Sequence, residues 1–335
     1  MSSQELETKI HFGVSTVNFQ QASLVETFRK AVLPGLRKQA DLSEVEGAIT
    51  ACEKIGDLSL ELVYRKWGEE KIKQLLNEKD IPILNVHGPV WWDTLHALKQ
   101  ALQEQDLVLV LADPFLPWLA YGFLKKEFSQ SYQLAQDLAC PHLTLHPGGA
   151  SILHQKGLLA EEIKQPIDVL IEPDWRRTRP LAKTWVWQPE KIIEIAQTTG
   201  LGITFDTSHQ LISQNKLDLC SAFEYYQQKS SGGVKVIHLS GAVLTETGRV
   251  HGSLPLDPRL IGEETISHFQ EFYQHLVDTD WQGAVIIETA SVKMLGQPTL
   301  DARIKATETS INVFQGERSN HPSVSLPHQP TSRPF

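Results

Sequence analysis

The sequence is poor in cysteine and lacks the glycine-rich loop that binds dinucleotide phosphates. Its 335 residues include only three cysteines, Cys52, Cys140 and Cys220, and no two of them form a Cys-x-x-Cys pair. A disulfide framework is therefore excluded, and we expect reduced thiols in a cytoplasmic protein. No glycine-rich phosphate fingerprint follows any of the apolar segments, which disfavours a dinucleotide-binding fold.

The sequence also lacks the features of membrane and nucleic-acid partners. Its longest apolar run, 107–123, is interrupted by Asp113, Pro114 and Pro117, which favours a buried helix pair or a lid over a membrane span. Residues 1–8 are polar and contain no apolar signal core. The net charge of −9 argues against a broad nucleic-acid surface. We therefore expect a small-molecule substrate, and the oligomeric state is left open.

Short apolar segments alternate with helical ones along most of the chain. The expected strands are 10–17, 57–63, 81–86, 143–145, 167–171, 202–205, 234–237 and 284–287. The expected helices are 41–55, 69–78, 189–198, 218–228, 263–276 and 300–314, with a long helical stretch at 94–140 that is broken near Pro114 and Pro117. This alternation predicts an α/β fold with a parallel sheet, most simply a closed (β/α)₈ TIM barrel. A doubly wound open sheet is the alternative.

The domain organisation follows from the same pattern. We predict a single barrel domain over residues 9–314. Residues 315–335 are rich in Pro, Ser and His and are expected to form a disordered tail.

One stretch, Gly202-Ile-Thr-Phe-Asp-Thr-Ser-His209, suggests where the chemistry lies. Asp206 would end a buried strand, and His209 has the opposite parity, so the two meet only if the chain has turned. This places His209 in a loop. The pair then forms half of a metal site, or else Asp206 caps the turn and His209 lies on the surface.

Other strand ends carry residues of the same kind. Together with Asp206 they form a set of six: His87, His146, Glu172, Asp206, His238 and Glu288. A single histidine after a strand is more often a hydrogen-bonded loop residue than a ligand. In a barrel, however, all of these ends converge on one face. Mixed imidazole and carboxylate ligands predict one or two divalent transition ions, such as zinc, manganese, iron or cobalt.

Six short segments along the chain carry a family resemblance, and they occur in the order NVHGP, TLHPGG, VLIEP, FDTSH, VIHLS and IIET. From about residue 10 to residue 314 the chain resembles the xylose-isomerase-like TIM barrels, which include endonuclease IV and the ketose 3-epimerases. The resemblance to the epimerases implies a metal held by Glu172, Asp206, His238 and Glu288. The resemblance to endonuclease IV implies that His87 and His146 share Glu172 with a second ion.

The chain departs from endonuclease IV at the third metal of that enzyme. The resemblance matches two of its ligands to His209 and His251, but Arg249 stands where an aspartate is expected. A guanidinium cannot ligate a metal ion. We therefore assign His209, Arg249 and His251 to substrate binding.

The segment 174–187 is unusually basic and aromatic. Arg176, with Arg177, Arg179 and Lys183, is suited to clamping a phosphate or carboxylate, and Trp175, with Trp185 and Trp187, to covering a sugar or base. The alternative is a solvated basic loop packed by its own tryptophans.

Three functions stay open from the sequence. The first is a metal-dependent isomerase or epimerase of a small sugar, polyol or related derivative, with Glu172 and Glu288 moving a proton at carbon. The second is a metal-dependent phosphoester hydrolase resembling endonuclease IV. The third is a barrel that binds metal or ligand without turnover.

Overall fold

The computed structural model describes residues 10–16, 42–63, 69–88, 115–146, 167–173, 175–177, 184–186, 189–214, 218–244, 250–289 and 299–317. Within these ranges the fold is built around one closed sheet. The remaining segments, which include Trp91, Arg179, Arg249 and the predicted tail beyond residue 317, lie outside the described residues.

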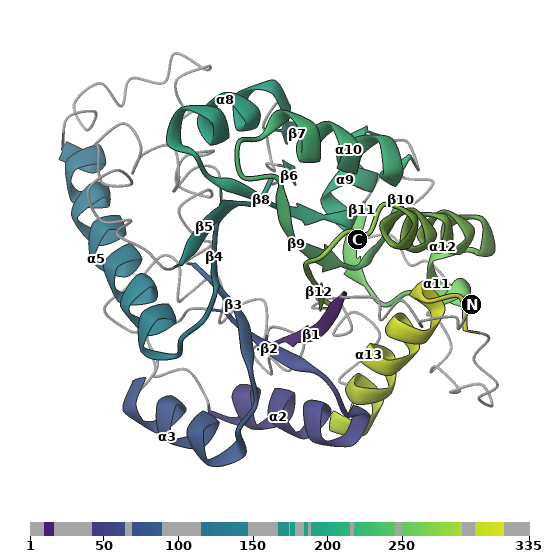
Figure 1. Cartoon of the computed structure of the whole chain (residues 1–335), viewed down its shortest axis with the longest axis horizontal. Coiled ribbons are helices and arrows are strands. Elements are labelled where there is room, and N and C mark those ends of the chain that lie inside the picture. Colours follow the sequence, from purple (N-terminus) through teal and green to yellow (C-terminus); the bar gives the residue numbers. More distant parts are fainter. Residues whose placement is uncertain are drawn as a thin grey trace, which may run out of the picture.

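Eight parallel strands close into a barrel in the order β1-β12-β9-β8-β5-β4-β3-β2 (Figure 1). Their bounds are β1 His11–Ser15, β2 Ser59–Val63, β3 Ile83–His87, β4 His142–Leu145, β5 Asp168–Ile171, β8 Gly202–Asp206, β9 Val234–Leu239 and β12 Ala284–Ile287. β1 pairs with both β12 and β2, which closes the circle. The predicted (β/α)₈ barrel is confirmed, and the open sheet is wrong.

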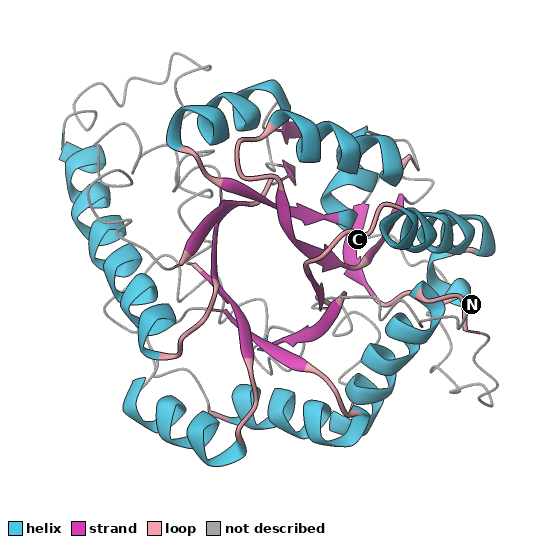
Figure 2. Cartoon of the chain, in the orientation of Figure 1, coloured by secondary structure: helices cyan, strands magenta, loops and turns pink. Residues whose placement is uncertain are grey.

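Helices surround this barrel on its outer side (Figure 2). They are α2 Ser43–Ile55, α3 Glu69–Lys79, α5 Phe115–Asp137, α8 Pro189–Thr199, α9 Thr207–Gln214, α10 Leu219–Lys229, α11 Pro258–Ile261, α12 Glu263–Asp278 and α13 Leu300–Phe314. Two antiparallel hairpins were not predicted: β6 Trp175–Arg177 with β7 Thr184–Val186, and β10 Gly241–Leu244 with β11 Val250–Leu254.

The helix α5 corrects one expectation. It begins at Phe115 and runs through Pro117, where the sequence predicted a break. Proline is tolerated there because the first-turn N–H groups of a helix have no partner within the helix. Among the described helices, none is both long and apolar enough to cross a bilayer.

The outer core packs the helices against the barrel wall. Phe205 of β8 meets Phe223 of α10 and Phe272 of α12, with ring centroids 5.7 Å from Phe205 in both cases. All three rings are at most 1% exposed, and burying each contributes about 1.5–3 kcal/mol. This cluster holds the strand whose end carries Asp206.

The barrel interior is apolar at its amino-terminal half. Leu170, Val236, Ala284 and Ile286 form a separate buried cluster there. Side chains two residues apart on a strand point to the same face. The next inward positions toward the carboxyl ends are therefore polar: Glu172 follows Leu170 on β5, and corresponding polar residues follow on β9 and β12.

Two glycines allow this apolar cluster to fill the interior. A Cβ on Gly13 would lie 2.7 Å from Ile286 Cδ1, and one on Gly202 would lie 2.8 Å from Leu170 Cδ2. The larger side chains occupy the space that these glycines leave. The apolar cluster thus forms a closed floor beneath the polar end of the barrel.

Candidate metal centre

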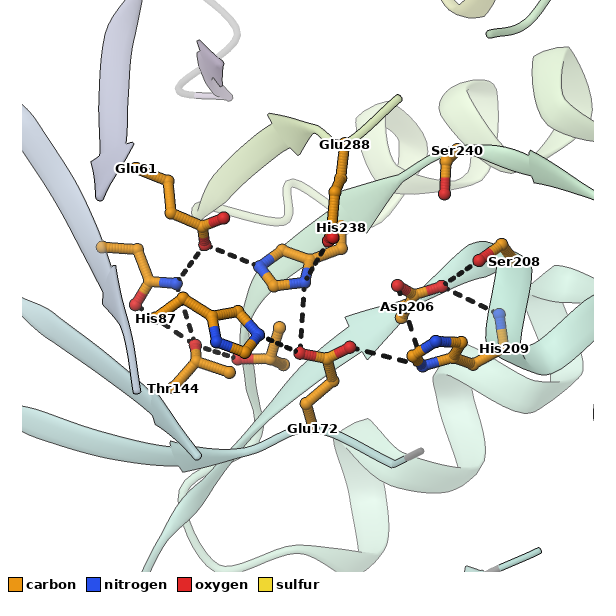
Figure 3. Close-up of polar contacts among 12 residues, drawn as sticks. Glu61, His87, Thr144, Glu172, Asp206, Ser208, His209, His238, Ser240 and Glu288 are labelled. Atoms are coloured by element: carbon orange, nitrogen blue, oxygen red, sulfur yellow. Dashed lines mark hydrogen bonds and ion pairs between the residues drawn. The ribbon is translucent and has the colours of Figure 1, made fainter. Parts of the chain in front are cut away.

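Glu172 lies at the centre of the polar end. It follows β5 directly and is 2% exposed. Its Oε2 lies 2.8 Å from His87 Nε2, 3.3 Å from His238 Nδ1 and 3.8 Å from His146 Nε2. Its Oε1 lies 3.3 Å from Nδ1 of His209. Four histidines from four parts of the chain therefore converge on one carboxylate, and Figure 3 shows three of them, His87, His209 and His238.

Asp206 ends β8, and α9 begins at the next residue. Its Oδ1 accepts hydrogen bonds from the backbone N–H of His209 and from Ser208 Oγ, both at 2.8 Å. The carboxylate thus caps the helix, which lets α9 start without a loop. The prediction of His209 in a loop is wrong for this reason.

His209 is not a surface residue, although Asp206 does act as a cap. Its side chain is 19% exposed, and its Nδ1 lies 3.0 Å from the carbonyl oxygen of Pro173. The first turn of α9 after Asp206 brings the imidazole back beside Glu172. The pair Asp206 and His209 therefore faces one space, as expected.

His238 projects from β9 and is fully buried. Its Nε2 is 2.8 Å from Glu61 Oε2. Its Nδ1 lies 3.2 Å from Glu288 Oε2 and 3.3 Å from Glu172 Oε2, yet makes no hydrogen bond within the described part of the chain. A buried ring nitrogen that faces two carboxylates without a well-aligned hydrogen bond is suited to binding a cation.

His87 presents its other ring nitrogen to the site. Its Nδ1 lies 2.9 Å from the carbonyl oxygen of Gly88, which can only accept, so Nδ1 carries the proton. In neutral His87 the Nε2 lone pair then points at Glu172. The ring of His146 lies beside it, with centroids 5.1 Å apart. A positive charge is needed between these nitrogens and the carboxylate.

The donor groups fall into three overlapping sets, in each of which one possible ligand atom per residue lies within 4.8 Å of the others: His87–His146–Glu172, Glu172–Asp206–His209 and Glu61–His238–Glu288. Imidazole nitrogens with carboxylate oxygens suit zinc, manganese, iron or cobalt. The residues present therefore fit a divalent transition ion. The identity of that ion is not fixed by the donors alone.

The electrostatics agree with a site built for a cation. Burial alone would raise the pKa of the Glu172 carboxyl, but the positive charges of His238 and His146 hold this pKa well below its usual range. Burial likewise opposes a charge on His238, yet the charges of Glu61 and Glu172 raise its pKa well above the ordinary value. The carboxylates thus require positive charge, whether protons or a metal ion supply it.

Asp206 is in a different electrostatic position from Glu172. Burial raises the pKa of Asp206 to about 6, although the nearby charge of His209 opposes this shift. The negative charges of Glu172 and Glu288 also raise the pKa of Asp206. A cation bound beside Asp206 would therefore favour the ionised form of its carboxyl group.

The remaining predicted site residues lie in the two hairpins. Trp175 and Arg176 belong to β6, and His251 belongs to β11, where the structure gives the course of their backbone. β6, β10 and β11 all contact α9, the helix that carries His209. Arg249 is outside the described residues. Both hairpins therefore contact the helix that carries His209, and the assignment of these residues to substrate binding stays a prediction.

Sequence reasoning missed Glu61 as part of this centre. It lies in the middle of β2, is 0% exposed and hydrogen-bonds to His238. A signal was present, because a lone carboxylate inside the apolar strand Ser-Leu-Glu-Leu-Val has to find a buried partner. Its position before the strand end separated it from the other six residues.

A closed parallel barrel with imidazoles and carboxylates gathered at the carboxyl ends of its strands defines the class: a (β/α)₈ barrel with a candidate metal centre. A family model described as "Xylose isomerase-like TIM barrel" matches residues 49–315. The chain belongs to this family, which includes sugar isomerases and AP endonuclease-like enzymes.

Two similar solved structures have low sequence identity to this chain, and the likeness of the first to this chain shows the fold alone. "The crystal structure of AsfvAP:AG" is 12% identical, with a TM-score of 0.54 and coverage of 92% of this chain and 100% of that chain. "Crystal structure of AP endonuclease, family 2 from Brucella melitensis" is 12% identical, with a TM-score of 0.49 and coverage of 84% and 96%. No curated protein matches the sequence.

Proposed function

We propose that this protein is a metal-dependent isomerase or epimerase that moves a proton at carbon in a small sugar, polyol or related derivative. The observation that carries the proposal is the pair of carboxylates, Glu172 and Glu288, on either side of His238 Nδ1 at 3.3 and 3.2 Å. A divalent cation bound there would polarise adjacent oxygens of a hydroxy-ketone.

The two glutamates have different access to a substrate. The side chain of Glu288 is 18% exposed, whereas that of Glu172 is 2% exposed and lies within 4 Å of four imidazoles. Glu288, on the open side, would take the proton from the substrate carbon and then release it to solvent. Glu172 is ionised in the resting site, so it would first accept a proton from water and then deliver it to the substrate carbon from the other side.

The ligand set that we propose is Glu172, Asp206, His238 and Glu288 for the first ion. His87 and His146, sharing Glu172, are proposed to hold a second ion. The first set is supported by the contacts of His238 Nδ1 with Glu172 and Glu288 and by the burial of Asp206. The second set is supported by the short distances among His87, His146 and Glu172. Zinc, manganese and cobalt are the candidate ions.

For substrate binding we propose His209, His251 and the β6–β7 hairpin. The contact of β6 and β11 with α9 brings these elements next to the site. Arg176, Trp175 and Arg249 would supply a cationic and aromatic cover, which suits a substrate with a phosphate or carboxylate group. A cytoplasmic location is also proposed, because the sequence has only three cysteines, none in a Cys-x-x-Cys pair, and all three are free thiols in the structure.

The test is turnover with candidate ketoses, polyols and their phosphates in D₂O, followed by NMR. Incorporation of deuterium at a substrate C–H during turnover is the expected result, since proton transfer through a carboxylate exchanges with solvent. Turnover of a sugar without any exchange would point instead to a hydride shift or to a transfer shielded from solvent, and full activity in both Glu→Gln variants would rule out the glutamate pair.

A metal-dependent phosphoester hydrolase is the second candidate, and the His87–His146–Glu172 set favours it. Such a set beside the first ion is the arrangement of two-metal hydrolases, whose ions lie about 3.5–4 Å apart. The net charge of −9 weighs against it as a DNA enzyme, so we expect only weak, non-specific DNA binding.

Two measurements separate these candidates. Elemental analysis of wild type and His87→Ala gives the number of ions, and a change from two to one would support the second site. Metal-dependent cleavage of an abasic duplex at physiological salt would make the hydrolase the better assignment. A barrel that binds metal but turns over neither class of substrate would be a binding protein.

A further inference from the structure

A carboxylate that the proposed chemistry does not use lies inside the barrel beneath the site. Glu61 of β2 is 0% exposed and hydrogen-bonds to His238 of β9. These strands are separated in the barrel by β1 and β12, so the contact crosses the interior. Because Glu61 has no exposed surface, it cannot touch a substrate. Any effect of Glu61 on the reaction has to pass through another residue.

His238 uses its two ring nitrogens on opposite sides. Nε2 donates its proton to Glu61 Oε2 at 2.8 Å, because a carboxylate oxygen can only accept. Nδ1 faces Glu172 and Glu288 and makes no hydrogen bond to a described residue. Figure 3 shows Glu61 on one side of the ring and the other two carboxylates beyond its far edge.

We propose that Glu61 is a positioning residue: it fixes the ring orientation of His238 and the tautomer that carries its proton on Nε2, so that the Nδ1 lone pair is presented to a metal ion. The inference rests on the proposed function in one respect, that this site holds a divalent ion. A carboxylate behind a ligating imidazole orients the ring and increases its basicity toward metal.

Glu61 is itself held in place by hydrogen bonds. Asn85 Nδ2 donates to Glu61 Oε2 at 2.5 Å and also contacts Thr144 Oγ1 at 2.9 Å. The Thr144 hydroxyl in turn lies 2.7 Å from that of Thr204. Asn85, Thr144 and Thr204 are 0% exposed and come from β3, β4 and β8. A chain of hydrogen-bonded polar side chains inside the barrel thus holds the Glu61 carboxylate in place, and Glu61 in turn orients His238.

Glu61 is not a ligand of the same ion, although it lies within 4.8 Å of ligand atoms of His238 and Glu288. Glu61 Oε2 accepts the hydrogen bond from His238 Nε2. A ring nitrogen that donates a hydrogen bond has no lone pair left for a metal ion. An ion between Glu172 and Glu288 would bind Nδ1 on the other side of the ring. Glu61 therefore acts through His238.

The test uses Glu61→Gln, which keeps the shape but loses the charge, and Glu61→Leu, which removes the acceptor. Zn²⁺ affinity is measured by competition with a chelator. Glu61→Gln should lower it by about 10–100-fold, the usual effect of losing such a partner, and Glu61→Leu by at least as much. The matched control is Glu44→Gln on α2, a buried carboxylate outside the site, which should leave Zn²⁺ affinity unchanged.

Proton NMR supplies a reading that loss of packing alone would not give. Wild type should show a low-field Nε2–H resonance of His238, with or without Zn²⁺, and Glu61→Leu should lose it. Thermal unfolding in chelator checks that both variants fold. Affinities equal to wild type in both Glu61 variants, or a resonance that persists in folded Glu61→Leu, would overturn the inference.

The outcomes also separate this inference from the proposed function. If wild type bound Zn²⁺ in a Glu61-dependent way but turned over no sugar, the isomerase would fail and the positioning role would stand. If wild type bound no Zn²⁺ at all, the metal site would fail. The Nε2–H resonance would then decide: its loss in Glu61→Leu supports the role of Glu61, and its persistence refutes it.

Discussion

The two halves of the barrel interior are built from the same strands but from opposite kinds of residue. On β5, β9 and β12 the amino-terminal half carries Leu170, Val236 and Ile286, which are fully buried and touch other apolar groups. Two residues further along each strand, or at its end, the carboxyl-terminal half carries charge instead. On each of these strands, the residue that packs in the apolar core and the residue of the candidate metal centre are therefore two positions apart.

The difference between the halves is one of energetics as well as composition. The apolar floor stabilises the fold by excluding water. The polar half places buried carboxylates beside buried imidazoles, and desolvation offsets much of what their attraction contributes. We therefore expect substitutions in the floor to change stability, and substitutions in the site to change metal binding and turnover.

The largest expected effect comes from Asp206→Ala. Its loss removes a proposed ligand and the cap of α9, so the metal at this position should be lost and turnover abolished. Elemental analysis of purified protein checks this result. Asp278→Ala, on the exposed side of α12, is the control and should retain full metal content. Full metal stoichiometry in Asp206→Ala would remove Asp206 from the ligand set.

The next effect concerns the two glutamates as proton carriers. Glu172→Gln and Glu288→Gln each keep the shape and one ligand oxygen but cannot take a proton. Each should lower turnover by at least ~10², the low end for general acid–base catalysis. Deuterium incorporation from D₂O should fall in parallel. If both variants kept full activity, the glutamates would have no part in the chemistry.

The floor should respond in the opposite way. Leu170→Ala is expected to lower the free energy of unfolding by about 2–5 kcal/mol, because it removes buried methyl groups and leaves a cavity. Its metal content should equal that of wild type as long as the protein is folded. Denaturant titration in chelator gives the stability, and elemental analysis gives the metal. Loss of metal with unchanged stability would break the division between the two halves.

How much of this could be predicted from sequence depends on where a residue stands. Strand ends are marked by an apolar run followed by a polar residue, so Glu172 and Glu288 could be placed at the mouth of the barrel. Glu61 could not be placed in this way, because its partner His238 is 177 residues away and is reached only through the closed interior. The contact between Glu61 and His238 depends on the strand register and on closure of the barrel, which the local sequence pattern does not give.

Local sequence patterns gave the wrong secondary structure at His209 and Pro117 and missed the hairpin strands. His209 was expected in a loop, but the Asp206 carboxylate accepts a hydrogen bond from the backbone N–H of His209, one of the groups that a helix start leaves unpaired. Pro117 was expected to break a helix, but it lies in the first turn of α5. The hairpin strands β6 and β7 have three residues each, too few for a periodic signal.

The smallest expected effect tests how tightly the floor is closed. Gly13→Ala would place a methyl group 2.7 Å from Ile286 Cδ1 and 3.2 Å from the carbonyl oxygen of Ser59. The Ile286 methyl group can rotate away, whereas the Ser59 backbone in the neighbouring strand cannot move independently of the sheet. We therefore expect overpacking to lower the free energy of unfolding by about 1–3 kcal/mol, measured in denaturant with chelator present.

Metal content should stay at the wild-type level in Gly13→Ala, since the strain lies one layer below the site. The double variant Gly13→Ala with Ile286→Val offers the matched control. Shortening Ile286 makes room for the new methyl group, so the two changes together should destabilise less than the sum of the single changes. Strict additivity would mean that Gly13 and Ile286 do not share the space that the structure assigns to them, and that the floor is looser than its contacts imply.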